Sequence, residues 1–128
     1  MNWFEIPAAD FGRAVEFYER VLDCAIDTLE MDVGPYGVFE TDGDAVGGAI
    51  LAADEYSFDE RGSSVSIEPG ATGPTVYLHV GDGLTAALAR VEQAGGSVLV
   101  EPQPLDDGGE YAMVRDTEGN RVGVMTRE

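Results

Sequence analysis

The strongest constraint on the fold is a repeat within the chain. The segment Val38 to Gly47, VFETDGDAVG, matches the segment Val114 to Gly123, VRDTEGNRVG, at an offset of 76 residues. Both copies place an acidic residue beside a glycine between two extended apolar segments, which is typical of a hairpin turn. Because self-similarity of this kind marks a repeated structural unit, the chain is predicted to contain two copies of one module.

The beginning of each half also matches, at an offset of 72 residues. The segment EIPAAD ends at Asp10 and the segment YLHVGD ends at Asp82. Each aspartate is expected to be the N-cap of a helix, because its carboxylate can accept hydrogen bonds from the free N–H groups of the first turn. Apolar residues at helical spacing follow both aspartates and predict helices over residues 11–22 and 84–94.

Each half therefore has the pattern strand, helix and three strands. The strands are expected at 2–6, 25–31, 37–40 and 46–52 in the first half, and at 75–80, 97–101, 111–115 and 121–125 in the second. The predicted fold class is α+β, with two tandem βαβββ modules at 1–53 and 74–128. The segment 54–73 is rich in Gly, Ser, Asp, Glu and Pro, and we expect it to be a long connecting loop. A chain of 128 residues is expected to form one domain.

The charge of the chain limits its partners and its environment. There are 25 acidic and 7 basic residues, and the net charge is −18. Such a chain repels phosphate groups, so we expect neither nucleic acid nor an anionic membrane as a partner. All basic residues are Arg, and an acidic surface without Lys favours a salt-rich cytoplasm, as in halophiles; the alternative is an unusually acidic mesophilic protein. We expect a cytoplasmic protein, because the sequence shows no secretory signal or membrane span and has only one cysteine, Cys24.

The two ends of the chain resemble the vicinal oxygen chelate superfamily, which includes glyoxalase I, bleomycin-resistance and extradiol-dioxygenase proteins. The opening WFEIPAADFGRAVEFYERVL, with its Phe17–Tyr18 pair, is similar to the first strand and helix of that family, and the ending RDTEGNRVGVM is similar to its acidic turn and last strand. The resemblance implies a half-open barrel of two modules around a cavity, a homodimer, and metal ligands on the first and last strands of each module.

The chain departs from this family at the positions that correspond to the metal ligands. These positions hold Trp3, Gly47, Thr75 and Gly123 instead of His, Glu or Gln. Shifting the strand register by one residue gives no suitable set either. Because Trp, Thr and Gly do not supply the imidazole and carboxylate ligands of such a centre, we predict no metal and no other cofactor.

Alternation along the strands predicts which side chains face the cavity. If Trp3 faces it, so does Glu5; if Thr75 does, so do Tyr77 and His79. The expected ligand-binding residues are Trp3, Gly47, Ala49, Thr75, Tyr77, Gly123 and Met125. Glu5 and His79 are the candidate catalytic acid and base. For each there is a structural alternative: His79 bonded near a strand end, and Glu5 paired with an Arg or facing water. The aromatic residues Trp3, Phe39, Tyr77 and Tyr111 either stack a flat ligand or belong to the core.

Three functions are compatible with these observations. The first is a metal-independent protein that binds a small organic molecule between its modules, and the largely apolar cavity favours it. The second is a lyase, isomerase, epimerase or dioxygenase-type enzyme that uses Glu5 and His79 or an unrecognised metal site. The third is a structural or regulatory dimer module whose cavity is filled by its own side chains.

The charge makes stability depend on salt. At about 1 M salt the screening length falls to roughly 3 Å, so the repulsion among the acidic side chains largely disappears. We expect the melting temperature in calorimetry to rise markedly between low and molar KCl. Sucrose of equal osmolality is the control, because it changes hydration without screening charge. A melting temperature that KCl raises no more than sucrose does would contradict this prediction.

Overall fold

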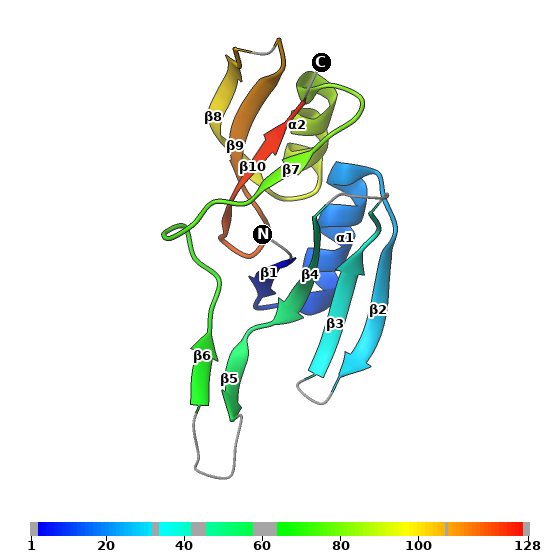
Figure 1. Ribbon diagram of the computed structural model, residues 1–128, viewed down its shortest axis with the longest axis vertical. Coiled ribbons are helices and arrows are strands. Elements are labelled where there is room, and N and C mark those ends of the chain that lie inside the picture. The colour runs from blue at the N-terminus through cyan, green and yellow to red at the C-terminus, as the bar shows by residue number, and fades with distance from the viewer. Residues whose placement is uncertain (1–2, 32–33, 42–45, 58–63, 107, 127–128) are drawn as a thin grey trace.

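The computed structural model describes residues 3–31, 34–41, 46–57, 64–106 and 108–126 (Figure 1). The first module comprises β1 (Trp3–Ala8), α1 (Phe11–Leu22), β2 (Ile26–Met31), β3 (Gly34–Phe39) and β4 (Gly47–Ala52). The second comprises β7 (Tyr77–His79), α2 (Leu84–Gln93), β8 (Ser97–Pro104), β9 (Glu110–Arg115) and β10 (Arg121–Met125). This order of elements confirms the two predicted βαβββ modules.

Each module forms its own four-stranded sheet. The strand orders are β1-β4-β3-β2 and β7-β10-β9-β8, so the two sheets have the same topology. The first strand pairs in parallel with the last, β1 with β4 and β7 with β10, and the other pairs are antiparallel. Helices α1 and α2 pack against each other and against strands of their own modules. One face of each sheet is therefore covered by a helix, and the opposite face is available for a site.

The two helices bury one apolar face each, as the sequence pattern predicts. The buried residues are Ala14, Phe17, Tyr18 and Val21 in α1, and Leu84, Ala87, Leu88 and Val91 in α2. They form a single core with the inward side chains of both sheets. This shared core holds the two modules together by burying apolar surface.

The predicted N-caps are correct for α1 and wrong for α2. Asp10 caps α1, accepting a hydrogen bond from the Arg13 backbone N–H, but the N-cap of α2 is Gly83 and has no side-chain hydrogen bond. Asp82 lies one residue too early to reach the helix N–H groups. It instead forms an ion pair with Arg90, with an Nη1–Oδ2 distance of 2.8 Å. Arg90 also donates to the Val21 carbonyl oxygen at 2.9 Å, so it links α2 to the end of α1.

The register of the first strands corrects the offset inferred from the sequence. Trp3 lies opposite Gly47 in the first sheet, and Tyr77 lies opposite Gly123 in the second. Tyr77, and not Thr75, is therefore the structural equivalent of Trp3. Thr75 precedes β7, where its Oγ1 accepts a hydrogen bond from Arg121 Nε at 3.0 Å. The link before α2 is longer than the link before α1, which is why a sequence offset read at the helices misplaces the strand.

The segment between the modules is not the irregular loop that the sequence predicts. It contains β5 (Asp54–Ser57) and β6 (Ser64–Ile67), which pair as an antiparallel hairpin. Figure 1 shows this hairpin extending away from both sheets at the lower end of the molecule. The acidic turn at 42–44 lies outside the described residues, whereas the equivalent turn at 116–120 joins β9 to β10 as predicted.

The acidic turn of the second module docks onto the first module. Asp116 is buried, and its Oδ2 accepts hydrogen bonds from Tyr18 Oη at 2.5 Å and Asn120 Nδ2 at 3.0 Å. Asn120 Nδ2 also donates to the Pro7 carbonyl oxygen at 2.7 Å. Beside them, Glu118 accepts hydrogen bonds from the Arg13 guanidinium and from the Asp10 backbone N–H. The turn thus fixes the second sheet to the start of α1.

The bond between Tyr18 and Asp116 makes stability depend on alkaline pH. Burial, together with the charge of Asp116, raises the pKa of Tyr18 well above 10.0. A raised folded pKa means that the contribution is fully present below about pH 10 and is lost as the pH rises above it, because the unfolded tyrosine ionises first. We expect Tyr18→Phe to lower the free energy of unfolding by about 1–2 kcal/mol at neutral pH.

Denaturant unfolding at several pH values checks this prediction. The difference between the wild-type protein and Tyr18→Phe should narrow above about pH 10. Tyr77→Phe is the control, since this tyrosine is exposed. An equal effect of both substitutions would refute the role assigned to Tyr18.

Candidate functional site

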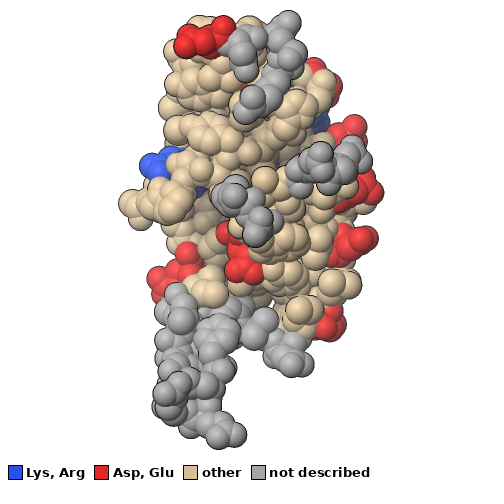
Figure 2. Space-filling model, in the orientation of Figure 1, with Lys and Arg blue, Asp and Glu red and all other residues tan. Residues whose placement is uncertain are grey.

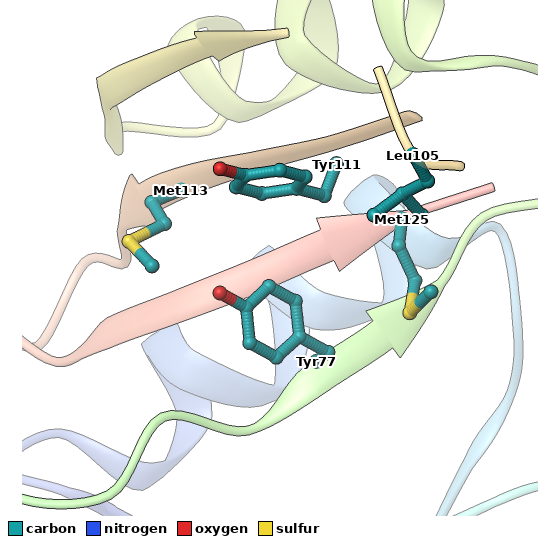
Figure 3. A pocket seen from close by; sticks show the side chains of 5 residues that line it. All are labelled: Tyr77, Leu105, Tyr111, Met113 and Met125. Carbon is teal, nitrogen blue, oxygen red and sulfur yellow. The ribbon is translucent and has the colours of Figure 1, made fainter. Parts of the chain in front are cut away.

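A pocket lies on the open face of the second sheet (Figure 3). Its volume is about 430 Å³, and it is lined by Tyr77, Leu105, Tyr111, Met113 and Met125. Tyr77 comes from β7, Met125 from β10, Tyr111 and Met113 from β9, and Leu105 from the turn that follows β8. We call it the tyrosine–methionine pocket.

Strand alternation explains how these side chains come together. Tyr111 and Met113 are two residues apart on β9 and therefore point to the same side of the sheet, while Ala112 between them is buried on the helix side. Met125 lies opposite Tyr111 in the ladder, and Gly123 lies opposite Tyr77. A Cβ at Gly123 would overlap the Tyr77 ring, so this glycine allows the ring to lie directly on the sheet.

The pocket is apolar with a small number of polar groups. The Tyr77 and Tyr111 rings meet edge to face, with their centroids 6.2 Å apart and their planes at 74°. The two hydroxyl groups are the polar atoms of the lining side chains and can donate or accept hydrogen bonds. The methionines add flexible, polarisable contacts that suit aromatic rings. This composition is typical of a site for a small organic molecule.

The open face of the first sheet carries a different set of side chains. Trp3 Nε1 donates a hydrogen bond to Tyr36 Oη at 2.9 Å, and Tyr36 Oη donates to Glu5 Oε2 at 2.6 Å. Burial and the hydrogen bond to Glu5 raise the pKa of the Tyr36 hydroxyl, while the bond from Trp3 acts in the opposite direction. The hydroxyl is therefore held protonated at neutral pH, as a donor to the carboxylate.

A second cavity lies between the modules and is larger, at about 740 Å³. Its lining includes Phe4, Cys24 and Phe39 from the first module, and Thr75, His79 and Met125 from the second. Burial and the nearby carboxylates Glu40, Glu19 and Asp23 raise the pKa of the Cys24 thiol. Because the thiolate is the nucleophilic form, Cys24 is not activated in this environment.

The structure places the predicted catalytic residues on different sheets. Glu5 lies opposite Ala49 on β1, and His79 lies opposite Met125 on β7, so they occupy equivalent positions of the two modules. Within the described ranges, no hydrogen bond or ion pair joins them. Their catalytic role stays a prediction.

The predicted ligand-binding residues have different environments. Trp3 and Tyr77 are exposed, at 45% and 42%, although large aromatic side chains normally belong to the core. Gly47 and Gly123 lie under their rings, whereas Ala49 is fully buried and Phe39 belongs to the core. Tyr77 and Met125 line the tyrosine–methionine pocket, so these two are brought together as predicted. The roles of the other residues in ligand binding stay predictions.

Sequence reasoning missed Tyr36, Leu105 and Met113. Alternation from Tyr111 predicts that Met113 shares its face, so this residue was within reach of the sequence pattern. Leu105 lies in a turn and Tyr36 reaches Glu5 across the sheet, and these two contacts depend on how the strands pair. In the part of the chain that the structure describes, His, Cys, Asp and Glu form no group of three or more suited to a metal ion, and no helix is long and apolar enough to cross a membrane.

Comparison with known families decides the relationship. The sequence model of the Glyoxalase/Bleomycin resistance protein/Dioxygenase superfamily matches residues 1–124. The chain belongs to this superfamily. The resemblance seen at the two ends of the sequence is thus confirmed over nearly the whole chain. No protein in the curated set matches the sequence.

Solved structures of this superfamily share the fold of the chain. A glyoxalase/bleomycin resistance protein from Albidiferax ferrireducens T118 is 17% identical with a TM-score of 0.67, covering 100% of this chain and 98% of that one. TioX from Micromonospora sp. ML1 is 21% identical with a TM-score of 0.66, covering 99% and 98%. TnmS3, an antibiotic binding protein from Streptomyces sp. CB03234, is 19% identical with a TM-score of 0.64, covering 100% and 95%. At these identities the likeness establishes the fold alone.

The contact between Gly123 and Tyr77 gives a test of the pocket geometry. In Gly123→Ala the new methyl group would overlap the Tyr77 ring, which is exposed and can swing outward. We expect the fold to persist and the contact between the Tyr77 and Tyr111 rings to be lost, as measured by NMR nuclear Overhauser effects. Gly70→Ala is the matched control, because a Cβ there meets nothing within 4 Å. A persistent ring contact in Gly123→Ala would show that Tyr77 is placed wrongly.

Proposed function

We propose that this protein binds a small organic molecule in the tyrosine–methionine pocket. One observation carries the proposal: five side chains from three strands and a turn converge on one apolar cavity, with two hydroxyl groups as the polar atoms among them. A cavity of about 430 Å³ lies within the size range of small-molecule sites. That TnmS3, with the same fold, is an antibiotic binding protein supports binding rather than catalysis.

The chemistry of the lining indicates the kind of ligand. Edge-to-face tyrosines and two methionines favour a flat, apolar ring system, since aromatic faces and sulfur atoms both interact well with rings. The Tyr77 and Tyr111 hydroxyls would orient a carbonyl, hydroxyl or amine substituent at the edge of such a ring. The expected ligand is therefore an aromatic or conjugated molecule with one polar edge.

We further propose that binding needs no metal ion and that the protein acts as a homodimer. The lining side chains are Tyr, Met and Leu, which are poor ligands for the metals that His and carboxylate groups hold. The pocket is open on one side, and the outer strands present unpaired backbone groups, which a second copy would cover. Leu29 on β2 and Leu99 on β8 are exposed apolar side chains near such edges.

Binding to this pocket can be measured with a panel of fluorescent polycyclic aromatic probes. For the probe that binds best, we expect Tyr111→Ala and Met125→Ala each to weaken affinity about tenfold, because each removes a buried contact that is worth ~1.5 kcal/mol or more. A chelator should leave the affinity unchanged. Leu99→Ala removes an exposed apolar side chain outside the pocket and is the matched control.

Two results would contradict the proposed function. Equal loss of affinity in Leu99→Ala and Tyr111→Ala would mean that the probes bind to apolar surface in general. Loss of binding with a chelator, restored by one metal, would place the protein among the metal-dependent members of its superfamily.

A further inference from the structure

The open face of the first sheet carries an ordered aromatic and acidic cluster outside the tyrosine–methionine pocket. Trp3, Tyr36 and Glu5 are joined by two successive hydrogen bonds, Nε1 to Oη at 2.9 Å and Oη to Oε2 at 2.6 Å. We call them the Trp3–Tyr36–Glu5 cluster. Trp3 and Glu5 come from β1, and Tyr36 comes from β3, two strands away across β4. The bonds therefore hold the indole, the phenol and the carboxylate in one arrangement.

The indole ring is fixed from below and open above. A Cβ at Gly47 would lie 2.8 Å from Trp3 Cζ3, so the ring packs directly on this glycine. The Trp3 side chain is nevertheless 45% exposed, which is a large fraction for tryptophan. An exposed aromatic face held at a fixed position is a surface for a ligand, and its negative quadrupole attracts cations.

The charge of Glu5 is not neutralised on its own sheet. The four strands β1 to β4 contain no Lys, Arg or His. The printed sequence has only 7 basic residues, and the two ion pairs found in the described parts of the chain, Arg13–Glu118 and Arg90–Asp82, lie elsewhere. Figure 2 shows acidic patches and little basic surface on the face that it presents. A cation that reaches this sheet therefore has no basic side chain of the same sheet to displace.

The equivalent positions of the second sheet lack this combination. Tyr77 takes the place of Trp3 over Gly123, and His79 takes the place of Glu5. The strands of that sheet also carry Arg115 and Arg121, which lie opposite each other on β9 and β10. The duplicated backbone thus provides an internal comparison, in which only the first copy joins an open aromatic face to an uncompensated carboxylate.

We propose that the Trp3–Tyr36–Glu5 cluster binds an organic cation, a quaternary ammonium or protonated amine group. The cation lies against the indole face, and the Glu5 carboxylate supplies the opposite charge. Tyr36 orients both groups, since its hydroxyl accepts from one and donates to the other. A divalent metal ion is a poorer match, because it requires several oxygen or nitrogen ligands and the cluster has one carboxylate. The proposal does not depend on the ligand of the tyrosine–methionine pocket.

Trp3 is the only tryptophan of the chain, so its fluorescence reports on this cluster alone. The probe is choline, and the control is its neutral isostere, in which a tert-butyl group replaces the trimethylammonium group. We expect choline to change the Trp3 emission saturably at millimolar concentrations, and the isostere to have little effect at constant ionic strength. An equal response to both compounds, or no response to millimolar choline, would overturn the proposal.

Two substitutions test the roles of the side chains. Glu5→Gln keeps the shape and hydrogen-bonding capacity of the side chain but removes the charge, and we expect it to weaken choline binding about fivefold. Tyr36→Phe should weaken it by a smaller factor, because the carboxylate remains but is no longer held. Glu16→Gln, at an exposed position of α1, is the control for the loss of one charge. Equal weakening in Glu16→Gln and Glu5→Gln would show that only the overall charge attracts choline.

The outcome is separable from the test of the proposed function. Tyr111→Ala and Met125→Ala should leave choline binding unchanged, and Glu5→Gln should leave the binding of neutral aromatic probes unchanged. Circular dichroism of each variant verifies that it is folded. If Tyr111→Ala abolished choline binding in a folded protein, the cation would belong to the tyrosine–methionine pocket, and the separate site would be refuted.

Discussion

The arrangement of this protein depends on the buried carboxylate of Asp116. Its Oδ1 accepts hydrogen bonds from the backbone N–H groups of Glu118 and Asn120, and its Oδ2 accepts from Tyr18 and Asn120 side chains. A buried carboxylate is costly unless such partners compensate for the loss of water. Because Tyr18 lies on α1 and the turn lies between β9 and β10, this compensation also joins the two modules. The site-bearing sheets are therefore positioned by a polar contact within an otherwise apolar core.

Duplication gives the two sheets one backbone, and divergence gives them different surfaces. In both modules an aromatic ring rests on a glycine of the last strand, Trp3 on Gly47 and Tyr77 on Gly123. In the first module the ring is followed two residues later by Glu5, and in the second by His79. The second sheet adds methionines and forms an apolar pocket, whereas the first presents a carboxylate held by Tyr36. Two classes of ligand group, aromatic and cationic, thus match two faces of one repeated design.

The acidic character of the chain acts on a different level from these sites. Most of its charge is spread over the surface, where it affects solubility and salt dependence more than the fold. Two carboxylates have specific structural partners, since Glu118 holds Arg13 and the first turn of α1, and Asp82 holds Arg90. Although burial opposes it, hydrogen bonding from Arg13 and its neighbours keeps the pKa of Glu118 below its ordinary value. Local pairing therefore makes a few acidic residues structural while the rest remain solvated.

The sequence alone determined the two modules, their order of elements and the limits of the helices, because repeats and apolar periodicity are local properties of the chain. It also indicated Tyr77 and Met125 as facing one cavity. The tertiary structure decided what depends on contacts between distant segments: that Tyr77 and not Thr75 matches Trp3, that Asp82 pairs with Arg90 instead of capping α2, and that Tyr36 links Trp3 to Glu5. Strand register and loop length set these contacts. A shift of one or two residues in either leaves the sequence pattern intact but changes which side chains meet.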